Sequence, residues 1–533
     1  MPTTAEIIAD TLKAAGVHRL FGLPGGEIAE LLGACRAAGL EFILTRHENA
    51  ACLMATATAE LTRRPSVVLA TLGPGATNLV NAVSNAWLER APVLVISAQV
   101  PTATASILPH QRIELEALFR PITKWSHTLT GRDTRAAVEH ALRLSQDGRP
   151  GPIYLALPSD VAREQEDASA ATATPDTTGL SAAPDVTRAA RLISEARRPL
   201  AVVGPALDPE KIQPTLLRWL DTTRIPALIT PKAKGLIPED HPLFVATCTG
   251  MAGDKLVAEF LAGSDLLVGI GFDPVECIRP FYTDRPFLSL AAYGMADRDF
   301  APALEMVGDP RDLLAALLPE LALRHTWAAE DVSGFRRRLA GHLTPQADRG
   351  PRGLSPARLF ARLRALAPRD TIVTVDTGAH KLLLGQIWAG YHPLSYFVSH
   401  GLSTMGTALP AAVALKRERP DRPVIAVTGD GGLAMTLGEL ETVARLQLPV
   451  VVVVLADRGL HLIRLQQERK GFRPDGVEFQ GIDFAGIAPG FGVHGTRVVA
   501  WDQLEPALSE AVQATRPTLI EVQVDPTDYD TML

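Results

Sequence analysis

The 533-residue chain has few cysteines and no long hydrophobic run. Its four cysteines, Cys35, Cys52, Cys248 and Cys277, are scattered without the spacing of metal ligands. This argues against a zinc site or a disulfide framework and fits a reducing cytoplasm. The longest apolar runs, such as residues 449–456, are far shorter than the roughly 20 residues that a membrane span needs. The N-terminal segment lacks the cationic start and apolar core of a signal peptide. We therefore expect a cytoplasmic protein that does not enter a membrane.

Two nucleotide-binding motifs are also missing. No segment matches the phosphate-binding loop GxxxxGK followed by Ser or Thr, and GIGFDP at residues 269–274 does not complete the dinucleotide fingerprint GxGxxG. A P-loop NTPase and a nicotinamide-dependent dehydrogenase are thus disfavoured. The net charge of −7 gives no electrostatic reason to expect binding to nucleic acid or to an anionic membrane. With 47% hydrophobic and 21% charged residues, the composition is typical of a globular protein.

Short runs rich in Val and Ile alternate with helical patterns along most of the chain. Such runs are typical of parallel strands that helices cover on both faces, so an α/β fold is predicted. Two polar stretches interrupt the pattern: residues 167–184, rich in Ala, Thr, Ser, Asp and Pro, and the charged residues 320–355. The predicted domains are residues 1–166, 185–319 and 356–533. The first and last of these end in similar sequences, which predicts two similarly built outer domains.

Two acidic residues follow two successive predicted strands. Asp430 comes after the run PVIAVTG and Asp457 after PVVVVVLA, with a helix-length segment between them. Strands joined by one helical crossover lie parallel and usually adjacent, so both residues are expected at the same edge of a sheet. Two carboxylates there repel each other unless a cation lies between them. Mg²⁺ with a diphosphate is the expected occupant, and the backbone carbonyl of Gly459 is a further candidate ligand. Three glycines allow the chain to approach a phosphate closely: Gly429, Gly431 and Gly432.

Other candidate residues have ordinary structural explanations when they are taken singly. Glu48 begins a predicted helix after the run EFILT, where an acidic residue favours the helix dipole. Gly73, in LATLGPGATNL, and the pair Gly25-Gly26, in FGLPGGEI, are typical of tight turns between a strand and a helix. Met405 is typical of a core residue. Only the combination of these residues points to a common site.

Taken together, these motifs resemble those of the thiamine diphosphate (ThDP)-dependent decarboxylases and carboligases. The segments RHE, TLGPGATNL, TMGTALPAA and GDGG, in this order along the chain, resemble the acetohydroxyacid synthase branch. The segments GDGGLAMTLGELETVARL and ADRGLHLIRLQQERK are most similar to the catabolic, FAD-independent acetolactate synthases. The resemblance covers nearly the whole chain. It implies three doubly wound parallel-sheet domains: a pyrimidine-binding, a central and a diphosphate-binding domain.

The resemblance also implies roles for individual residues. Glu48 would hydrogen-bond the N1′ atom of the cofactor's aminopyrimidine, the Ser403 carbonyl would face its 4′-amino group, and Met405 would be the apolar support that bends the cofactor. Gln111 and Gln466 would be catalytic residues near the thiazolium and the substrate. Mg²⁺ would be bound by Asp430, Asp457 and Gly459. Further contacts with the cofactor would come from Gly25, Gly26, Gly73, Gly378, Ala379, His380, Gly429, Gly431, Gly432 and Leu460.

The implied reaction is a ThDP- and Mg²⁺-dependent decarboxylation of a 2-oxo acid, expected to be pyruvate, with ligation to a second carbonyl compound. In this family two subunits build each cofactor site, which implies a homodimer or homotetramer with Glu48 and Asp430 from different copies. FAD is not expected, because Ala252 stands where FAD-binding members have histidine. Glu27, which replaces an alanine or lysine, and residues 461–463 also depart from the family and leave the acyl substrate open. The alternatives are a simple 2-oxo acid decarboxylase, an acyltransferase and a non-catalytic member that keeps the fold.

Overall fold

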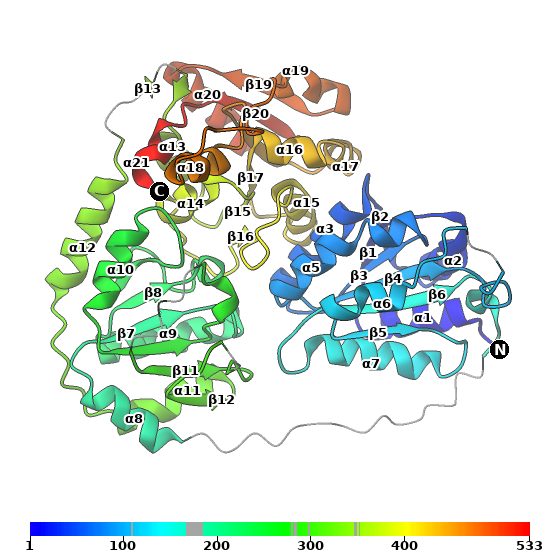
Figure 1. Cartoon of the computed structure of the whole chain (residues 1–533), viewed down its shortest axis with the longest axis horizontal. Helices are drawn as coiled ribbons and strands as arrows, with labels where there is room; N and C mark the ends of the chain where they lie inside the picture. Colours follow the sequence, from blue (N-terminus) through cyan, green and yellow to red (C-terminus); the bar gives the residue numbers. More distant parts are fainter. Residues whose placement is uncertain are drawn as a thin grey trace. The chain divides into compact units, whose positions relative to one another are not determined.

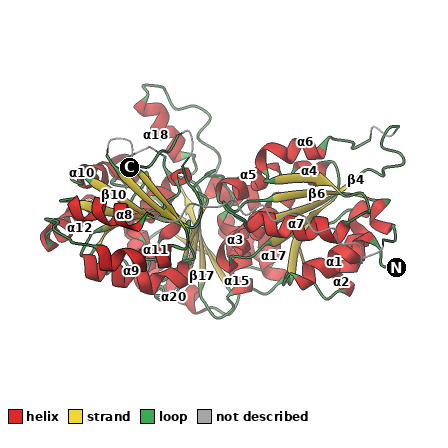
Figure 2. Cartoon of the chain, turned by 90° about the horizontal axis from the view of Figure 1, so that it is seen from below, coloured by secondary structure: helices red, strands yellow, loops and turns green. Residues whose placement is uncertain are grey.

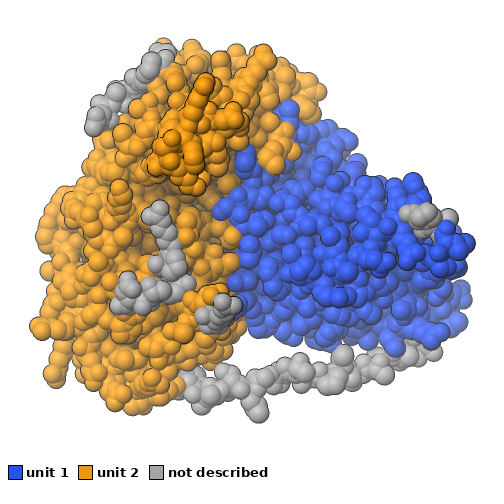
Figure 3. All heavy atoms as spheres, in the orientation of Figure 1, with its two compact units in different colours: residues 1–179, 402–418, 436–446 blue, residues 180–401, 419–435, 447–533 orange. Residues whose placement is uncertain are grey.

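The computed structural model describes residues 1–107, 110–166, 185–278, 281, 285–296, 299–345, 349–350 and 352–533. The chain forms two compact units, which Figure 3 colours separately. Unit 1 comprises residues 1–179, 402–418 and 436–446, and unit 2 comprises residues 180–401, 419–435 and 447–533. None of the described helices is long and apolar enough to cross a membrane. The predicted linker at 167–184 lies outside the described residues.

Unit 1 contains a parallel six-stranded sheet in the order β2-β1-β3-β4-β6-β5. Its strands are β1 (Arg19–Leu23), β2 (Glu41–Leu44), β3 (Ser66–Ala70), β4 (Val93–Gln99), β5 (Trp125–Thr128) and β6 (Ile153–Pro158). The helices between them are α1 (Thr4–Ala14), α2 (Ala29–Ala37), α3 (Glu48–Thr62), α4 (Pro74–Thr77), α5 (Val80–Leu88), α6 (Leu115–Phe119) and α7 (Thr134–Gln146). Two helices from later in the chain, α15 (Ala408–Glu418) and α17 (Glu439–Arg445), also belong to this unit.

Helices cover both faces of this first sheet. Helices α1, α2 and α7 share one apolar cluster with the sheet, to which Val67 and Leu69 of β3 contribute. Because side chains alternate along a strand, Val68 points to the opposite face, where α3 packs against β1 and β3 and carries α15 on its outer side. The α3 helix, which begins at Glu48, is therefore held between the sheet and α15.

Unit 2 contains two further parallel six-stranded sheets, with the orders β12-β11-β10-β7-β8-β9 and β16-β15-β17-β18-β20-β19. The strands of the central sheet are β7 (Pro199–Val203), β8 (Ala227–Ile229), β9 (Phe244–Thr247), β10 (Leu266–Ile270), β11 (Phe287–Ala291) and β12 (Leu304–Val307). Its helices are α8 (Val186–Glu195), α9 (Pro209–Thr223), α10 (Asp254–Ala262), α11 (Pro310–Leu317) and α12 (Ala329–His342). In Figure 1 these elements are the green part of the chain.

The C-terminal sheet consists of β15 (Ile372–Val375), β16 (Tyr396–Val398), β17 (Val424–Gly429), β18 (Val450–Ala456), β19 (His494–Val498) and β20 (Thr518–Gln523). Its helices are α13 (Pro356–Leu366), α14 (Ala379–Ile387), α16 (Asp430–Thr436), α18 (His461–Arg469), α19 (Phe484–Ile487), α20 (Trp501–Gln513) and α21 (Thr527–Met532). A short antiparallel pair, β13 (Arg349–Gly350) and β14 (Gly353–Leu354), precedes it. Helices and strands alternate along most of the chain, and Figure 2 shows red helices packed around the yellow strands.

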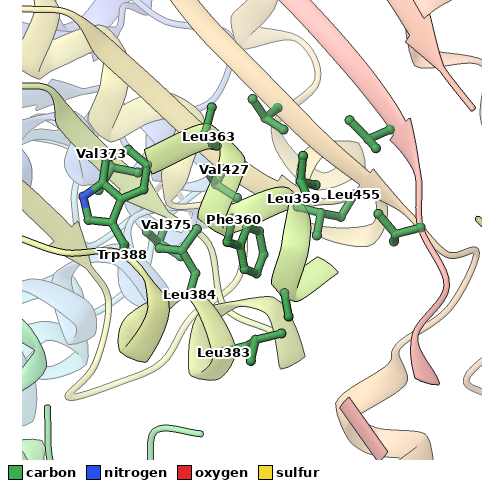
Figure 4. Packing of buried hydrophobic residues seen from close by; sticks show 14 of the residues in the cluster. Leu359, Phe360, Leu363, Val373, Val375, Leu383, Leu384, Trp388, Val427 and Leu455 are labelled. Atoms are coloured by element: carbon green, nitrogen blue, oxygen red, sulfur yellow. The ribbon is translucent and has the colours of Figure 1, made fainter. Parts of the chain in front are cut away.

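Buried aliphatic and aromatic side chains hold α13 and α14 against the C-terminal sheet. Figure 4 shows Phe360 and Leu363 of α13, Leu384 of α14 and Trp388, the residue after α14, around the strand residue Val375. All five are at most 1% exposed. Burying each such side chain contributes about 1.5–3 kcal/mol. This packing fixes α14, whose N-terminus follows the end of β15.

The predicted α/β fold with three parallel-sheet domains is confirmed. If the strands of each sheet are numbered separately along the chain, the first and third sheets have the same strand order, 2-1-3-4-6-5. The two outer sheets are therefore built alike, as the sequence predicted. Two details differ from expectation. The connection at 320–355 contains the helix α12, and the segment between Asp430 and Asp457 holds two helices, α16 and α17, instead of one.

Candidate functional site

Asp430 and Asp457 meet at the C-terminal edge of the third sheet. Strands β17 and β18 are paired in parallel with Gly429 opposite Leu455, so each aspartate lies just beyond its strand. The Arg458 N–H donates to Oδ2 of Asp430 at 2.7 Å, and the Gly431 N–H donates to Oδ1 at 2.8 Å. The predicted convergence of the two carboxylates is therefore present in the structure.

At Asp457, burial and the negative charge of Asp430 outweigh the favourable positive charge of Arg352. Burial, followed by the negative charge of Asp430, raises the pKa of Asp457 to about 7, and burial raises the pKa of Asp430 as well. A divalent cation between them would relieve both the repulsion and the cost of burial. In the described part of the chain, no group of three or more His, Cys, Asp or Glu residues is arranged to hold a metal. The pair thus suits Mg²⁺, which takes few protein carboxylates and completes its shell with phosphate and water oxygens.

A compact cradle lies next to this edge, between the ends of β15 and β17. A Cβ atom added to Gly378 would lie 2.6 Å from the His380 ring, one on Gly429 would lie 3.2 Å from it, and one on Gly432 would lie 2.6 Å from the Asp376 carboxylate. Asp376 ties the two strand ends together, because it accepts hydrogen bonds from the Thr377 N–H at 2.7 Å and the Thr428 hydroxyl at 3.0 Å. The structure therefore brings the predicted residues Gly378, Ala379, His380, Gly429, Gly431 and Gly432 together.

The His380 imidazole in this cradle has an unsatisfied polar atom. Burial, assisted by the charge of Lys381, lowers the pKa of His380 to about 4. Its Nε2 atom is buried and has no hydrogen-bond partner among the described residues. An anion placed there would favour the protonated ring and accept its hydrogen bond. The cradle therefore fits a phosphate group, in agreement with the glycine positions.

Asp457 also lines a cavity of about 360 Å³. Its walls include Gly459, Leu460 and His461, at the start of α18. Gly459 forms an antiparallel bridge with Glu478, and its backbone N–H bonds the Asp457 carboxylate. Gln466 lies farther along α18, is exposed and does not line this cavity.

Glu48 is the first residue of α3 and is buried, with 5% of its surface exposed. Its Oε2 atom accepts a hydrogen bond from the Asn78 side-chain amide at 2.9 Å. A Cβ atom added to Gly75 would lie 3.4 Å from Oε1 of Glu48. The segment TLGPGATNL thus folds directly against this carboxyl group, and its strand-turn-helix geometry is as predicted. Asn78 was not predicted as a site residue, because its only signal in the sequence is its place in that segment.

The predicted residues Gly25, Gly73 and Gln111 lie around the same turn. A Cβ atom on Gly25 would lie 2.4 Å from the Thr71 hydroxyl, and one on Gly73 would lie 3.0 Å from Cβ of Gln111. Gly73 and Gln111 both adopt positive φ, at +56°, a conformation that costs a non-glycine residue such as glutamine free energy. By contrast, a Cβ atom on Gly26 would meet open space.

Ser403 and Met405 also belong to unit 1, just before α15. Ser403 has a positive φ of 56°. The neighbouring Thr404 hydroxyl accepts a hydrogen bond from the Asn81 side chain at 3.1 Å, which ties this loop to α5. The predicted pyrimidine-side residues therefore share unit 1, and the predicted diphosphate- and metal-side residues share unit 2.

Models of protein families match three parts of the chain. The N-terminal TPP binding domain of thiamine pyrophosphate enzymes matches residues 2–118, their central domain matches residues 186–317, and their C-terminal TPP binding domain matches residues 376–522. Thiamine pyrophosphate (TPP) is another name for ThDP. The chain belongs to the family of thiamine pyrophosphate enzymes.

Full-length relatives place it among the acetolactate synthases. The chain is 32% identical to the acetolactate synthase of Bacillus subtilis (strain 168), over 98% of this chain and 93% of the relative. It is 30% identical to the catabolic acetolactate synthase of Raoultella terrigena, over 98% and 95%. It is 29% identical to the large subunit of acetolactate synthase isozyme 2 of Escherichia coli (strain K12), again over 98% and 95%. The predicted resemblance is confirmed.

Proposed function

We propose that the chain is a ThDP- and Mg²⁺-dependent enzyme that decarboxylates a 2-oxo acid and ligates the remaining acyl unit to a second carbonyl compound. Pyruvate is the expected donor, since the similar proteins are acetolactate synthases. The observation that carries the proposal is the Asp430–Asp457 pair beside the His380 cradle, in a chain whose family binds thiamine pyrophosphate.

The diphosphate end of the cofactor is assigned to unit 2. Asp430, Asp457 and the Gly459 carbonyl would hold Mg²⁺, and the cradle around His380 would hold the diphosphate, with Leu460 alongside. The charge balance supports this assignment. Burying two carboxylates next to a negatively charged diphosphate is unfavourable, and a divalent cation bound between them offsets that cost. The remaining diphosphate contacts are assigned to Gly378, Ala379, Gly429, Gly431 and Gly432.

The pyrimidine end is assigned to Glu48, with Gly25, Gly26, Gly73, Ser403 and Met405 around it. ThDP, when bound, supplies a carbon nucleophile and an acceptor for the electrons that remain when carbon dioxide leaves. Glu48 holds and returns a proton at the aminopyrimidine nitrogen, and Asn78 orients its carboxyl group through the 2.9 Å hydrogen bond. Gln111 and Gln466 are assigned to the substrate side.

We further propose three functional domains, at residues 1–166, 185–319 and 356–533, and an assembly of two or four copies in the cytoplasm. In this assembly Glu48 of one copy and Asp430 of another would serve the same cofactor. A monomer that stays active on dilution would contradict it. A simple 2-oxo acid decarboxylase and an acyltransferase, which would use the same cofactor chemistry, remain alternatives to the carboligase. A non-catalytic member is disfavoured by the hydrogen-bonded Glu48 and the paired aspartates.

Packing in the central sheet supports a reaction without FAD. In a sheet of this order a dinucleotide binds beyond the strands at the switch point, here β7 and β10. The loops after these strands are bonded to each other, with the Ala206 N–H donating to the Gly271 carbonyl at 2.8 Å. A Cβ atom on Gly204 would lie 2.6 Å from the same carbonyl oxygen, and Phe272 is fully buried. The loops at the switch point thus pack closely against each other, which leaves little room between them for a dinucleotide.

The function is tested by a screen of 2-oxo acids with ThDP and Mg²⁺ and without FAD. Carbon dioxide and the organic product are measured together, so ligation, aldehyde release and acyl transfer to phosphate give different products. We expect saturable carbon dioxide release from pyruvate, a ligated hydroxy ketone or hydroxy-oxo acid, and no stimulation by added FAD. No carbon dioxide from any 2-oxo acid would refute the proposed function.

The role of Asp457 in metal binding can be tested separately. Asp457→Ala should abolish most of the rise in melting temperature that ThDP with Mg²⁺ produces, because a ligand stabilises the folded state only in proportion to its binding. The matched control is Asp475→Ala, which changes an exposed aspartate in the loop that follows α18. If ThDP with Mg²⁺ raises the melting temperature of Asp457→Ala as much as that of the control, Asp457 does not bind the metal.

A further inference from the structure

We propose that Glu27 brings a second carboxylate to the Glu48 site and makes the enzyme prefer an uncharged carbonyl compound, such as an aldehyde, over a second 2-oxo acid as the acceptor. This inference rests on the proposed function. It narrows the acceptor class, which neither the family nor the site residues assigned above define for this chain.

The position of Glu27 follows from a short series of contacts in unit 1. The Thr71 hydroxyl donates to Oε2 of Glu27 at 2.8 Å. The methyl group of Thr71 lies 2.7 Å from a Cβ position built on Gly75, and Oε1 of Glu48 lies 3.4 Å from that same position. One threonine and one glycine therefore separate the two carboxyl groups. Gly25, whose built Cβ would meet Thr71 at 2.4 Å, keeps the turn that carries Glu27 close to this point.

Within the described residues, the charge of Glu27 is not balanced by an ion pair. Among the residues that the structure describes, no Lys, Arg or His forms an ion pair with Glu27. Glu30, one turn farther along, differs in this respect, because the Arg163 guanidinium donates to it at 2.6 Å. Glu27 is also only partly buried, so part of this side chain is exposed to solvent.

A negative charge at this place affects the two substrates differently. The donor loses its carboxylate as neutral carbon dioxide, so repulsion from Glu27 is relieved as the donor reacts. An acceptor that is itself a 2-oxo acid keeps its carboxylate, so the repulsion persists through ligation. An aldehyde carries no charge and avoids it. An unpaired like charge is a common way to exclude one ligand in favour of another, and at contact range in a partly wet site it is worth about a tenfold preference.

The test compares acceptors in the enzyme loaded with ThDP and Mg²⁺. Unlabelled pyruvate is supplied as donor together with ¹³C-labelled acetaldehyde, and labelled acetoin is measured against acetolactate. We expect the wild type to form mainly labelled acetoin, and Glu27→Gln to shift the product ratio about tenfold toward acetolactate. Glutamine keeps the acceptor oxygen for Thr71, so only the charge changes. Glu27→Lys should shift the ratio further, and Glu30→Gln should leave it unchanged.

A binding measurement gives a readout that does not depend on turnover. Calorimetry with lactate and with its neutral amide, lactamide, should show lactate binding about tenfold tighter to Glu27→Gln than to the wild type, with lactamide unchanged. Normal carbon dioxide release with an unaltered product ratio and unaltered lactate affinity would overturn the role of Glu27 alone. No carbon dioxide release by the wild type would overturn the proposed function and this inference together.

Discussion

Replacing Glu48 with glutamine should lower turnover by about 10²–10⁴-fold, the usual contribution of a positioned proton-transfer group. Glutamine has the same size and retains an oxygen for the Asn78 amide, which lies 2.9 Å from Oε2 in the wild type. It cannot hold and return a proton. The measurement is the rate of carbon dioxide release with saturating ThDP, Mg²⁺ and 2-oxo acid. The rise in melting temperature on adding cofactor should remain, because it depends mainly on the diphosphate end.

The control for this variant is Asp10→Asn, a comparable neutralisation of an exposed carboxylate on α1. It should leave both turnover and cofactor-induced stabilisation at the wild-type level. If Glu48→Gln ligates its substrates at a rate within about threefold of this control, Glu48 does not transfer a proton, and the assignment of the pyrimidine end to unit 1 loses its main support.

The proposed metal site at the edge of the third sheet could be predicted from the sequence, because it depends on local rules. Strand ends are marked by the change from a Val-rich run to an acidic residue, and a single helical crossover brings such ends to one edge of the sheet. Asp430 and Asp457 satisfy both conditions, and the structure places them at adjacent strand ends. The glycines beside them are required for the same local reason, close approach of backbone to neighbouring groups.

The environment of Glu48 was harder to predict from the sequence, because it depends on contacts between distant segments of the chain. Asn78 and Gly75 reach Glu48 from 30 and 27 positions away in the chain, and no pattern near Glu48 indicates them. Its role was inferred from a resemblance, not from the residues alone. The break between α16 and α17 is similar. The local sequence favours one helix, but Gly438 lies against Arg46, where an added Cβ atom would be only 3.2 Å from the arginine side chain.

Another contact without any sequence signal joins the central and C-terminal sheets within unit 2. The segment PKAKGLIPED is typical of an exposed charged loop, yet Lys234 is only 2% exposed. Its ammonium group donates to Glu239 at 2.5 Å, to the Gly385 carbonyl of α14 at 2.9 Å and to the Thr247 hydroxyl at 3.1 Å. All three of its N–H donors are thus used, and α14, which begins at the phosphate cradle, is tied to the central sheet.

Lys234→Met should therefore lower the free energy of unfolding by about 3–5 kcal/mol, because it leaves the Glu239 carboxyl group buried without its counter-ion. Burial already raises the pKa of Glu239, against the opposing effect of Lys234. In the variant this opposition is lost, so Glu239 is stabilised in its protonated form. A carboxyl group whose pKa is higher in the folded state adds stability below its unfolded pKa and loses it as the pH rises through the folded pKa. The deficit of the variant should thus be smaller at pH 5.5 than at pH 8.

Urea unfolding followed by tryptophan fluorescence measures this effect, since Trp219 and Trp388 are both buried in unit 2. The double variant Lys234→Met with Glu239→Gln removes both charges, and its loss should be smaller than the sum of the two single losses because the residues are directly coupled. Strictly additive losses, or a single variant within about 1 kcal/mol of the wild type at pH 8, would show that the pair does not hold the two sheets together. A coupled result would instead show that the orientation of α14, and with it the approach of His380 to a bound phosphate, depends on a lysine in the loop after β8 of the central sheet.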